Sequence, residues 1–428
     1  MNRIHKTTLA TAVSLSMALM GGHAQAAGFS LMEKNATDLG QAYANLATGN
    51  GQASGMIGNP AAMTQIDGTA VSGGVAYIRP SFELQAGATS DGGGSMGLGG
   101  DAGEPAAIPN ASIVHRLNER TRVGVALTVP FGLATEYDEE WLGRYHGIES
   151  RIEVIDISSS ISFDLTPQWT IGGALNIQRA EAKLTSAINS TAATGGFMTL
   201  PDGEVEIEGD DWSVGYTIGA LWQPTERTRV GLSYHSGIDH QLEGDVDYTV
   251  PTALAANSAF ADSPAEAGLD LPASLSASLT HQFSDTVTGS LGLLWTGWSS
   301  FEELKVEQSG GRESVTTENW DDTLRVAMGG EWEFAPRWTL RAGAAYDPTP
   351  VPSAAFRTTR LPDADRVWGS IGLGYAFNQR WSVDVGYTHI WLNDSSIDNT
   401  TESSIPDTLQ GRYEAEVDIL GLQVNARF

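Results

Sequence analysis

Apolar residues recur at every second position along most of the chain from Thr69 onward. In one clear segment, residues 212–222, the odd-numbered positions are mainly small or polar and the even-numbered ones are mainly apolar. A period of two predicts β-strands with one apolar face. The opposite face consists of Gly, Ser, Thr, Asn and Asp, which are too small and polar for the inner layer of a β-sandwich.

The connections between these segments alternate in length. Six short turns lie at 116–120, 165–168, 223–226, 282–285, 334–337 and 377–380, and seven long loops lie near 85–108, 132–150, 185–208, 240–270, 306–318, 347–365 and 393–412. This alternation is typical of bacterial outer-membrane barrels. Lipid admits only helices or closed barrels, because an open sheet edge leaves backbone groups without partners. The pattern therefore predicts an all-β fold, a 14-stranded antiparallel transmembrane β-barrel over residues 69–428.

Aromatic residues support this prediction. Trp169, Trp338 and Trp381 each follow a short turn directly, where an interfacial aromatic girdle is expected. The last strand ends in Phe428, which resembles the signal that outer-membrane proteins present to their barrel insertion machinery. Its apolar positions change parity after Ile419, so we expect a β-bulge there.

The first 26 residues have the features of a secretory signal peptide. Arg3 and Lys6 give a charged start, residues 9–20 are apolar, and Ala24-Gln25-Ala26 provides a small-x-small cleavage pattern. We therefore expect residues 1–26 to be removed and the protein to reside in the bacterial outer membrane, in contact with its lipid.

Charge and residue usage exclude several functions. Removing Arg3 and Lys6 from 24 basic residues leaves 22 against 52 acidic ones, a formal charge of −30. This balance argues against nucleic acid as a partner, which requires a basic surface. There is no cysteine, and none of the eight histidines lies in a nucleophile motif. We expect no enzyme activity, no metal site and no cofactor.

Residues 27–68 lack long alternation and are rich in small residues. Within "GNPAAM" (58–63), Asn59 suits a helix N-cap and Pro60 the first helical position. Because a 14-stranded barrel encloses a lumen wide enough to leak, we expect this segment to form a plug, or hatch, rather than a periplasmic tail.

Several motifs carry a family likeness. Ala27-Gly28-Phe29, Asn59-Pro60-Ala61 and "PFGLAT" (130–135) resemble the long-chain fatty-acid transporter (FadL-type) family of Gram-negative outer membranes, which also includes aromatic hydrocarbon transporters. The stretches 298–305, 350–368 and 375–391 match as well, so the resemblance covers nearly the whole mature chain.

The resemblance implies a route for hydrophobic compounds. Extracellular loops capture the ligand, which moves to an inner pocket at Phe29. A kink of the third strand at Pro130, Phe131 and Gly132 opens a gap in the wall. The hatch segment of Asn59, Pro60 and Ala61 points into this gap, and the ligand leaves sideways into the membrane.

The sequence departs from the fatty-acid members at the head group of the ligand. Their basic inner-wall residues correspond to Ser186 and Thr316, neither of which pairs with an anion. Lys183, Lys305 or Arg325 would be substitutes, although such side chains also form structural ion pairs. A pocket without a cation favours an uncharged ligand, because an unpaired buried carboxylate is costly. Fatty acid and neutral hydrocarbon both remain open.

Two further classes fit a barrel with long acidic loops. A general diffusion porin would have no plug, and a structural or adhesive surface barrel would need only the loops. The hatch and the Gly132 region favour transport of hydrophobic compounds.

Overall fold

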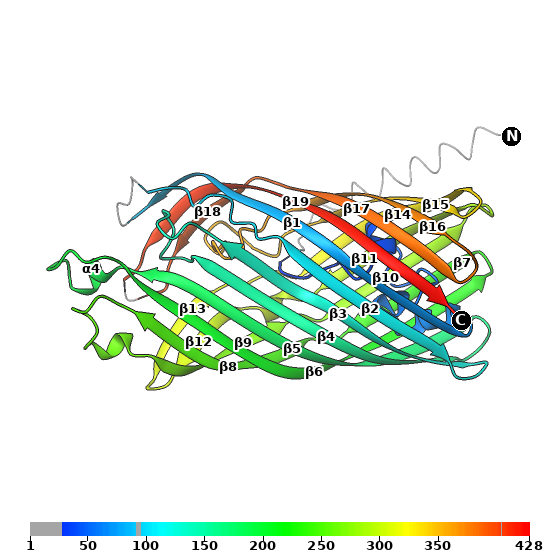
Figure 1. The fold of residues 1–428 in the computed structure, drawn as a ribbon, viewed down its shortest axis with the longest axis horizontal. Helices are drawn as coiled ribbons and strands as arrows, with labels where there is room; N and C mark the ends of the chain where they lie inside the picture. Colours follow the sequence, from blue (N-terminus) through cyan, green and yellow to red (C-terminus); the bar gives the residue numbers. More distant parts are fainter. Residues whose placement is uncertain (1–27, 91–95, 404) are drawn as a thin grey trace.

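The computed structural model describes residues 28–90, 96–403 and 405–428, and the predicted signal peptide lies outside them. A single antiparallel sheet closes on itself into a barrel (Figure 1). Its strands are β1 (Thr69–Thr89), β2 (Ala106–Arg116), β3 (Thr121–Glu136), β4 (Glu149–Asp164), β5 (Trp169–Ile188), β6 (Gly203–Thr225), β7 (Thr228–His235), β8 (Ile238–Thr249), β9 (Ser263–Leu271), β10 (Ser274–Gln282), β11 (Val287–Thr296), β12 (Glu303–Gln308), β13 (Arg312–Thr317), β14 (Thr323–Ala335), β15 (Trp338–Asp347), β16 (Arg366–Ala376), β17 (Trp381–Leu392), β18 (Ser395–Thr400) and β19 (Thr408–Arg427).

Several consecutive strands follow one path through the wall. β7 continues into β8, β9 into β10, β11 into β12, β13 into β14, and β17 into β18, with short interruptions. The barrel therefore has 14 antiparallel strands, and β1 pairs with β19 to close it. The predicted fold class is confirmed. Parts of the predicted long loops are instead strand, as in β6 and β8.

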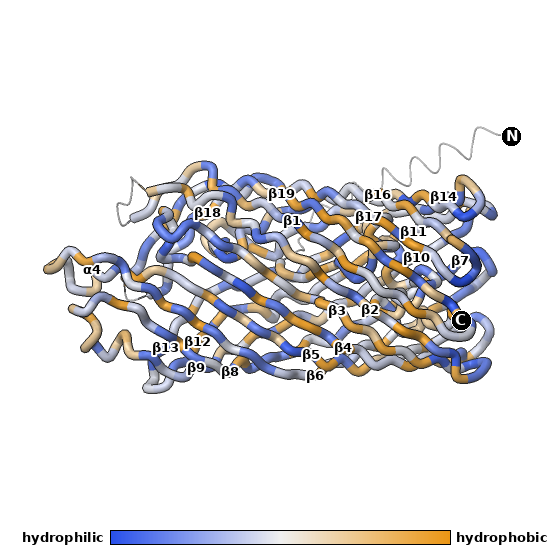
Figure 2. Tube along the Cα trace, viewed as in Figure 1, coloured by the Kyte–Doolittle hydropathy of each residue, from blue (hydrophilic) through white to orange (hydrophobic). Residues whose placement is uncertain are grey.

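The two faces of the wall differ as the alternation predicted. Apolar residues concentrate in the half of the barrel that carries the short turns (Figure 2). Their side chains point outward, and Trp169, Trp338 and Trp381 are all exposed directly after short turns. The same strands point Gly, Ser and Thr inward, where the hatch packs against them.

The expected bulge near Ile419 is wrong. β19 pairs with β1 and β17 without a register shift around this residue. Instead, the two faces exchange polarity: Tyr413, Val417 and Ile419 point into the lumen, whereas Leu420 and Leu422 point outward. Tyr413, Val417 and Ile419 pack into buried apolar clusters inside the barrel, so the apolar positions change parity while the backbone stays regular.

Residues 28–68 fill the barrel interior as short turns and helices (Figure 1). These are α2 (Ala36–Leu39), α3 (Gly55–Gly58) and the 3₁₀ helix η1 (Pro60–Gln65). The expected helix start is confirmed, because Asn59 accepts a 2.9 Å hydrogen bond from the Ala61 amide.

The remaining helical turns lie outside the hatch. They are α4 (Ser190–Ala193), η2 (Ser258–Phe260) and η3 (Trp298–Ser300). Within the described ranges, we find no helix that is both long and apolar enough to cross a membrane.

Buried polar groups tie the hatch to the wall. Asp384 of β17 forms a 2.7 Å ion pair with Arg341 of β15 and accepts hydrogen bonds from Asn425 of β19 (2.8 Å) and Gln52 of the hatch (3.0 Å). Buried polar groups are costly unless they are paired, so this network favours one position of the hatch.

Candidate functional site: a gap in the wall at the start of the hatch

The hydrogen-bonded wall is interrupted between β2 and β3. On one side, β2 pairs with β1 along all but its last residue, from Ala106 opposite Ile78 to His115 opposite Thr69. On the other side, it pairs with β3 only from Ala111 downward. The backbone of residues 106–110 therefore forms a free edge on the side of β2 that faces β3, with no ladder hydrogen bonds to β3.

Proline lies on both sides of this gap. Pro109 is on the free edge of β2, and Pro130 is on the facing part of β3. Proline has no backbone N–H, so it is tolerated at edges and bulges rather than in a complete ladder. The pairing of β3 with β4 also shifts register between Thr128 and Phe131, so β3 is distorted at this level. The kink that the resemblance implied at Pro130–Gly132 coincides with this bulge.

The start of the hatch takes the place of the missing partner. The amide of Leu31 donates a 2.8 Å hydrogen bond to the carbonyl of Pro130, and the amide of Gly132 donates one of 3.0 Å to the carbonyl of Phe29. Ser30 and Phe131 form an antiparallel bridge between these bonds. Above the gap, Ala102 joins β1 to β3 through backbone bonds with Phe82 and Glu136. The opening is thus bounded above and below.

An aromatic cluster surrounds Phe29. Its ring centroid lies 5.0 Å from that of Trp298, 5.6 Å from Phe301 and 5.8 Å from both Phe131 and Trp320. These separations are favourable for tilted and edge-on aromatic pairs. The cluster forms an apolar, mainly buried floor below the long loops of the barrel.

Polar contacts fix the residue before Phe29. The amide of Gly28 donates to Asp363 (3.1 Å), and Arg366 donates to its carbonyl (2.9 Å) while pairing with Asp363 at 2.7 Å. Gly28 has a φ of +59°, and a Cβ there would lie 2.7 Å from the rings of Trp298 and Trp320. Only glycine fits this position without strain.

A cavity of about 380 Å³ occupies the gap. Its lining comes from the hatch (Phe29, Leu31), the free part of β2 (Ala107, Ile108) and the lumen-facing side of β19 (Val417, Ile419), together with other mainly apolar side chains. This volume suits part of an acyl chain or a small hydrocarbon.

Asn59, Pro60 and Ala61 lie elsewhere, which corrects the expectation that they point into the gap. Asn59 donates to the carbonyl of Ala220 on β6 at 3.1 Å. The turn is packed so closely on the wall that a Cβ on Gly172 would lie 2.5 Å from Ala61 N. This turn therefore fixes the hatch against β5 and β6, whereas Phe29–Leu31 occupies the gap.

Two of the three candidate head-group cations lie on the outer face of the wall. The ammonium of Lys183 is 3.0 Å from Glu206 and 3.5 Å from both Glu149 and Glu208. The ammonium of Lys305 is 2.6 Å from Glu307 and 3.1 Å from Glu313. Their positions on these strands place them outside the lumen, in ion pairs.

Arg325 is buried between the wall and the hatch. It lies 3.6 Å from Asp347, donates to the carbonyl of Ala42 at 3.0 Å and sits 4.7 Å above the ring of Trp368. These contacts make it a structural link to the hatch rather than a free cation.

Ser186 and Thr316 both line a cavity of about 470 Å³ between the long loops. Arg360 lines it as well and donates to the hydroxyl of Ser150 (2.9 Å) and the carbonyl of Glu149 (3.3 Å). Burial lowers the pKa of Arg360 to about 10, which is partly offset by the charge of Glu318. Burial also raises the pKa of Glu318 to about 8, although the indole N–H of Trp320 donates to it at 2.8 Å.

The chain matches the family "Outer membrane protein transport protein (OMPP1/FadL/TodX)" over residues 17–428, and it belongs to this family of outer-membrane transport proteins. It is 28% identical over 406 residues to the long-chain fatty acid transport protein of Escherichia coli O6:H1, covering 89% of this chain and 90% of the relative. It is 27% identical over 471 residues to outer membrane protein P1 of Haemophilus influenzae, covering all of both chains.

Solved structures share the fold. The crystal structure of a Pseudomonas aeruginosa FadL homologue superposes with a TM-score of 0.88 at 27% identity, covering 94% of this chain and 100% of that one. The Pseudomonas putida toluene transporter TodX superposes with a TM-score of 0.66 at 19% identity, covering 88% and 94%. The predicted family and outer-membrane location are confirmed.

Sequence reasoning missed most of the residues around Phe29. Trp298 and Phe301 lie in "WSSFEELK", and Asp363 and Arg366 lie in the 350–368 stretch, both of which carry the family resemblance. The spacing of these residues along the chain does not predict that they contact Gly28 and Phe29. Strands β11 and β16 and helix η3 are far from the hatch in sequence and are brought to it only by the fold. Pro109 and Pro130 are a sequence feature that could have predicted the gap, because proline cannot donate a ladder hydrogen bond.

Proposed function

We propose that this protein transports hydrophobic compounds, long-chain fatty acids or hydrocarbons, from the extracellular side into the outer membrane through the gap between β2 and β3. The observation that carries the proposal is the replacement of β2 by Phe29–Leu31 along Pro130–Gly132. Hatch and wall are thus joined where the barrel is incomplete, beside an apolar cavity of about 380 Å³.

The cavity between the loops supplies a capture site for the same route. Its apolar contributors include Ile188, Val205 and Phe260, all from the extracellular part of the barrel. A hydrophobic molecule gains free energy by staying in contact with apolar surface, so an exit into lipid is favoured over a path through a water-filled pore. The names of the relatives, a fatty acid transport protein and a toluene transporter, support this substrate class.

The filled lumen favours this proposal over a diffusion porin. The hatch packs on facing strands: a Cβ on Gly231 of β7 would lie 2.0 Å from the carbonyl oxygen of Ala47, and one on Gly343 of β15 would lie 2.3 Å from the carbonyl carbon of Gln41. Such close contacts leave little space for a continuous ion path at this level.

The experiment blocks the gap without touching the hatch. Ala107→Trp places a large side chain on the exposed face of β2 inside the gap, and Ala111→Trp places the same side chain on the same face below it, opposite Leu127. We expect Ala107→Trp to reduce uptake of a labelled fatty acid or alkylbenzene in cells, and Ala111→Trp to leave it unchanged. Both variants should show the normal heat-dependent shift in gel mobility.

Normal uptake by Ala107→Trp would refute exit through this gap. Large, steady ion currents from the wild type in planar bilayers would instead favour the porin.

A further inference from the structure

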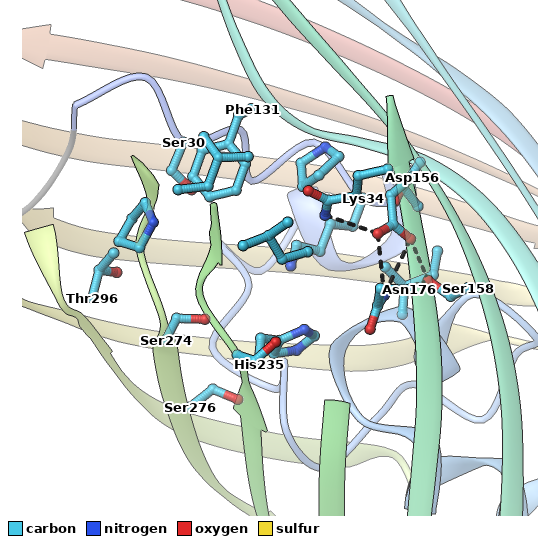
Figure 3. Close-up of a pocket in the computed structure, with 18 of the residues that line it drawn as sticks. Ser30, Lys34, Phe131, Asp156, Ser158, Asn176, His235, Ser274, Ser276 and Thr296 are labelled. Carbon is cyan, nitrogen blue, oxygen red and sulfur yellow. Dashed lines mark hydrogen bonds between the residues drawn. The ribbon is translucent and has the colours of Figure 1, made fainter. Parts of the chain in front are cut away.

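Lys34 places a cation inside the barrel below the aromatic cluster. It follows the paired segment Phe29–Leu31 of the hatch and borders a small cavity of about 80 Å³ in the lumen. Asp156, Ser158 and Asn176 form one wall of this cavity, and Figure 3 shows Lys34 between them and His235 and Ser274 on the facing wall.

The ammonium of Lys34 lacks a close counter-charge. Within the described residues, no carboxylate oxygen lies within 4.0 Å of its nitrogen. Asp156 is near, but its oxygens already accept hydrogen bonds from Ser158 (2.5 Å), Asn176 (3.2 Å) and Gln178 (2.9 Å). Burial lowers the pKa of Lys34 more than Asp156 and Glu33 raise it. A buried ammonium in this situation is stabilised by any anion that approaches it.

Three arginines near the ligand path are already engaged, and Arg151, which lines the gap cavity from the exposed face of β4, lies 4.0 Å from Glu149. Arg366 pairs with Asp363 and Arg325 with Asp347. Arg360, at the extracellular mouth, uses its guanidinium to hold Ser150 and Glu149. Lys34 is therefore the lumen cation whose contacts in the described chain leave it most open to a ligand.

The side of the cavity away from Asp156 is lined by hydroxyl groups. Ser274, Ser276 and Thr296 come from β10 and β11. Hydroxyl groups donate hydrogen bonds to a carboxylate as readily as they accept them from other ligands. A carboxylate on this side would meet Lys34 and donors while keeping its distance from Asp156.

The polar cavity adjoins the apolar one in the wall gap. Ser30 lines both, and consecutive residues of the β3 bulge divide between them, with Pro130 and Phe131 lining the polar cavity and Val129 and Gly132 lining the apolar one. The volumes match this division, since about 80 Å³ suits a head group and about 380 Å³ suits part of an acyl chain.

We propose that Lys34 binds the carboxylate of an amphipathic ligand whose hydrocarbon tail occupies the wall gap. This inference rests on the proposed function and selects fatty acids over neutral hydrocarbons as its preferred substrate class. In this proposal the head group is bound by a residue of the hatch, and not by the outer-face candidates Lys183 and Lys305.

The test is a competition assay on the purified full chain in detergent. An uncharged fluorescent alkyl probe is displaced by a long-chain fatty acid, its methyl ester or an alkylbenzene. We compare wild type with Lys34→Met, Lys34→Arg and the matched control Lys305→Met, which removes an outer-face lysine. Heat-dependent gel mobility verifies folding, and Lys34→Gln replaces Lys34→Met if the latter does not fold.

For the wild type, we expect the acid to displace the probe about tenfold better than the ester, equivalent to 1.4 kcal/mol. Lys34→Met should remove this preference while ester affinity stays constant, and Lys34→Arg and Lys305→Met should retain it. Equal displacement by acid and ester in the wild type would overturn the inference and leave the proposed function standing. Loss of the preference in Arg360→Met but not in Lys34→Met would also overturn it. Failure of all three compounds to compete would refute the proposed function itself.

Discussion

The amide of Gly132 donates a 3.0 Å hydrogen bond to the carbonyl of Phe29, and this bond joins the barrel wall to the plug at the point where the wall is open. A Cβ on Gly132 would lie 2.9 Å from Cδ1 of Leu31. The hatch segment can therefore stay paired with β3 only if residue 132 is small.

Gly132→Val tests this pairing. We expect the larger side chain to displace Leu31, to speed hydrogen exchange of the Leu31 amide and to lower uptake by about tenfold, a change of 1.36 kcal/mol in the rate-limiting barrier. Gly73→Val is the control, because a Cβ there would meet no atom within 4 Å. Unchanged exchange at Leu31 in Gly132→Val would contradict the role of this contact.

A second pair of variants tests how the hatch seals the lumen. A Cβ on Gly219 would lie 1.9 Å from Oδ1 of Asn59, so Gly219→Ala should push the Asn59–Pro60 turn off the wall. Gly173→Ala is the matched control, because the nearest atom to a Cβ at Gly173 would be 3.7 Å away. We expect higher ion conductance in planar bilayers for Gly219→Ala alone. Similar conductance for both variants would show that the turn does not seal the barrel.

Glu318 should make stability depend on pH. Burial raises its pKa from 4.5 to about 8, so the folded state binds more protons than the unfolded state between these values. Its contribution to stability is thus fully present below pH 4.5 and is lost as pH rises through about 8. We expect the unfolding temperature to fall over this range in the wild type, and to fall less in Glu318→Gln. An equal pH dependence in the two proteins would contradict the raised pKa.

The outer wall carries carboxylates directly opposite one another. Glu208 of β6 faces Asp245 of β8, and Asp210 faces Glu243. Like charges at such positions destabilise a sheet by up to about 1 kcal/mol. Asp245→Asn should therefore raise the unfolding temperature, most clearly at low ionic strength, because salt screens exposed charges. A decrease in the unfolding temperature would indicate that Asp245 has a stabilising contact.

The sequence predicted the barrel well because its two signals are local. The alternation of apolar and polar residues shows that the two faces of each strand differ in polarity. The alternation of short turns with long loops shows which connections share one end of the barrel. Neither signal states which apolar face meets lipid and which meets the lumen. For that reason, the parity change at Ile419 predicts a bulge from the sequence alone, although the backbone there is regular.

The site was harder to predict because it depends on contacts between distant segments. The family resemblance points to Phe29 and Gly132, and the structure joins these two residues by a backbone bond across 103 residues of sequence. The resemblance misplaced the Asn59 turn, which lies on β5 and β6. The free ammonium of Lys34 was invisible in the sequence, because ion pairing of a lysine depends on neighbours that only the fold supplies.

The polarity exchange along β19 has a consequence for a migrating ligand. The exchange occurs at Ile419, which pairs with Ile78 of β1, and Ile78 pairs in turn with Ala106, the first residue of β2 and the upper edge of the gap. Apolar surface thus runs down the inside of the wall to this level and continues on the outside below it. For a ligand taking the proposed route, the gap joins the apolar inner surface above it to the apolar outer surface below it. The hydrocarbon chain can therefore pass from the lumen to the lipid while it stays in contact with apolar side chains.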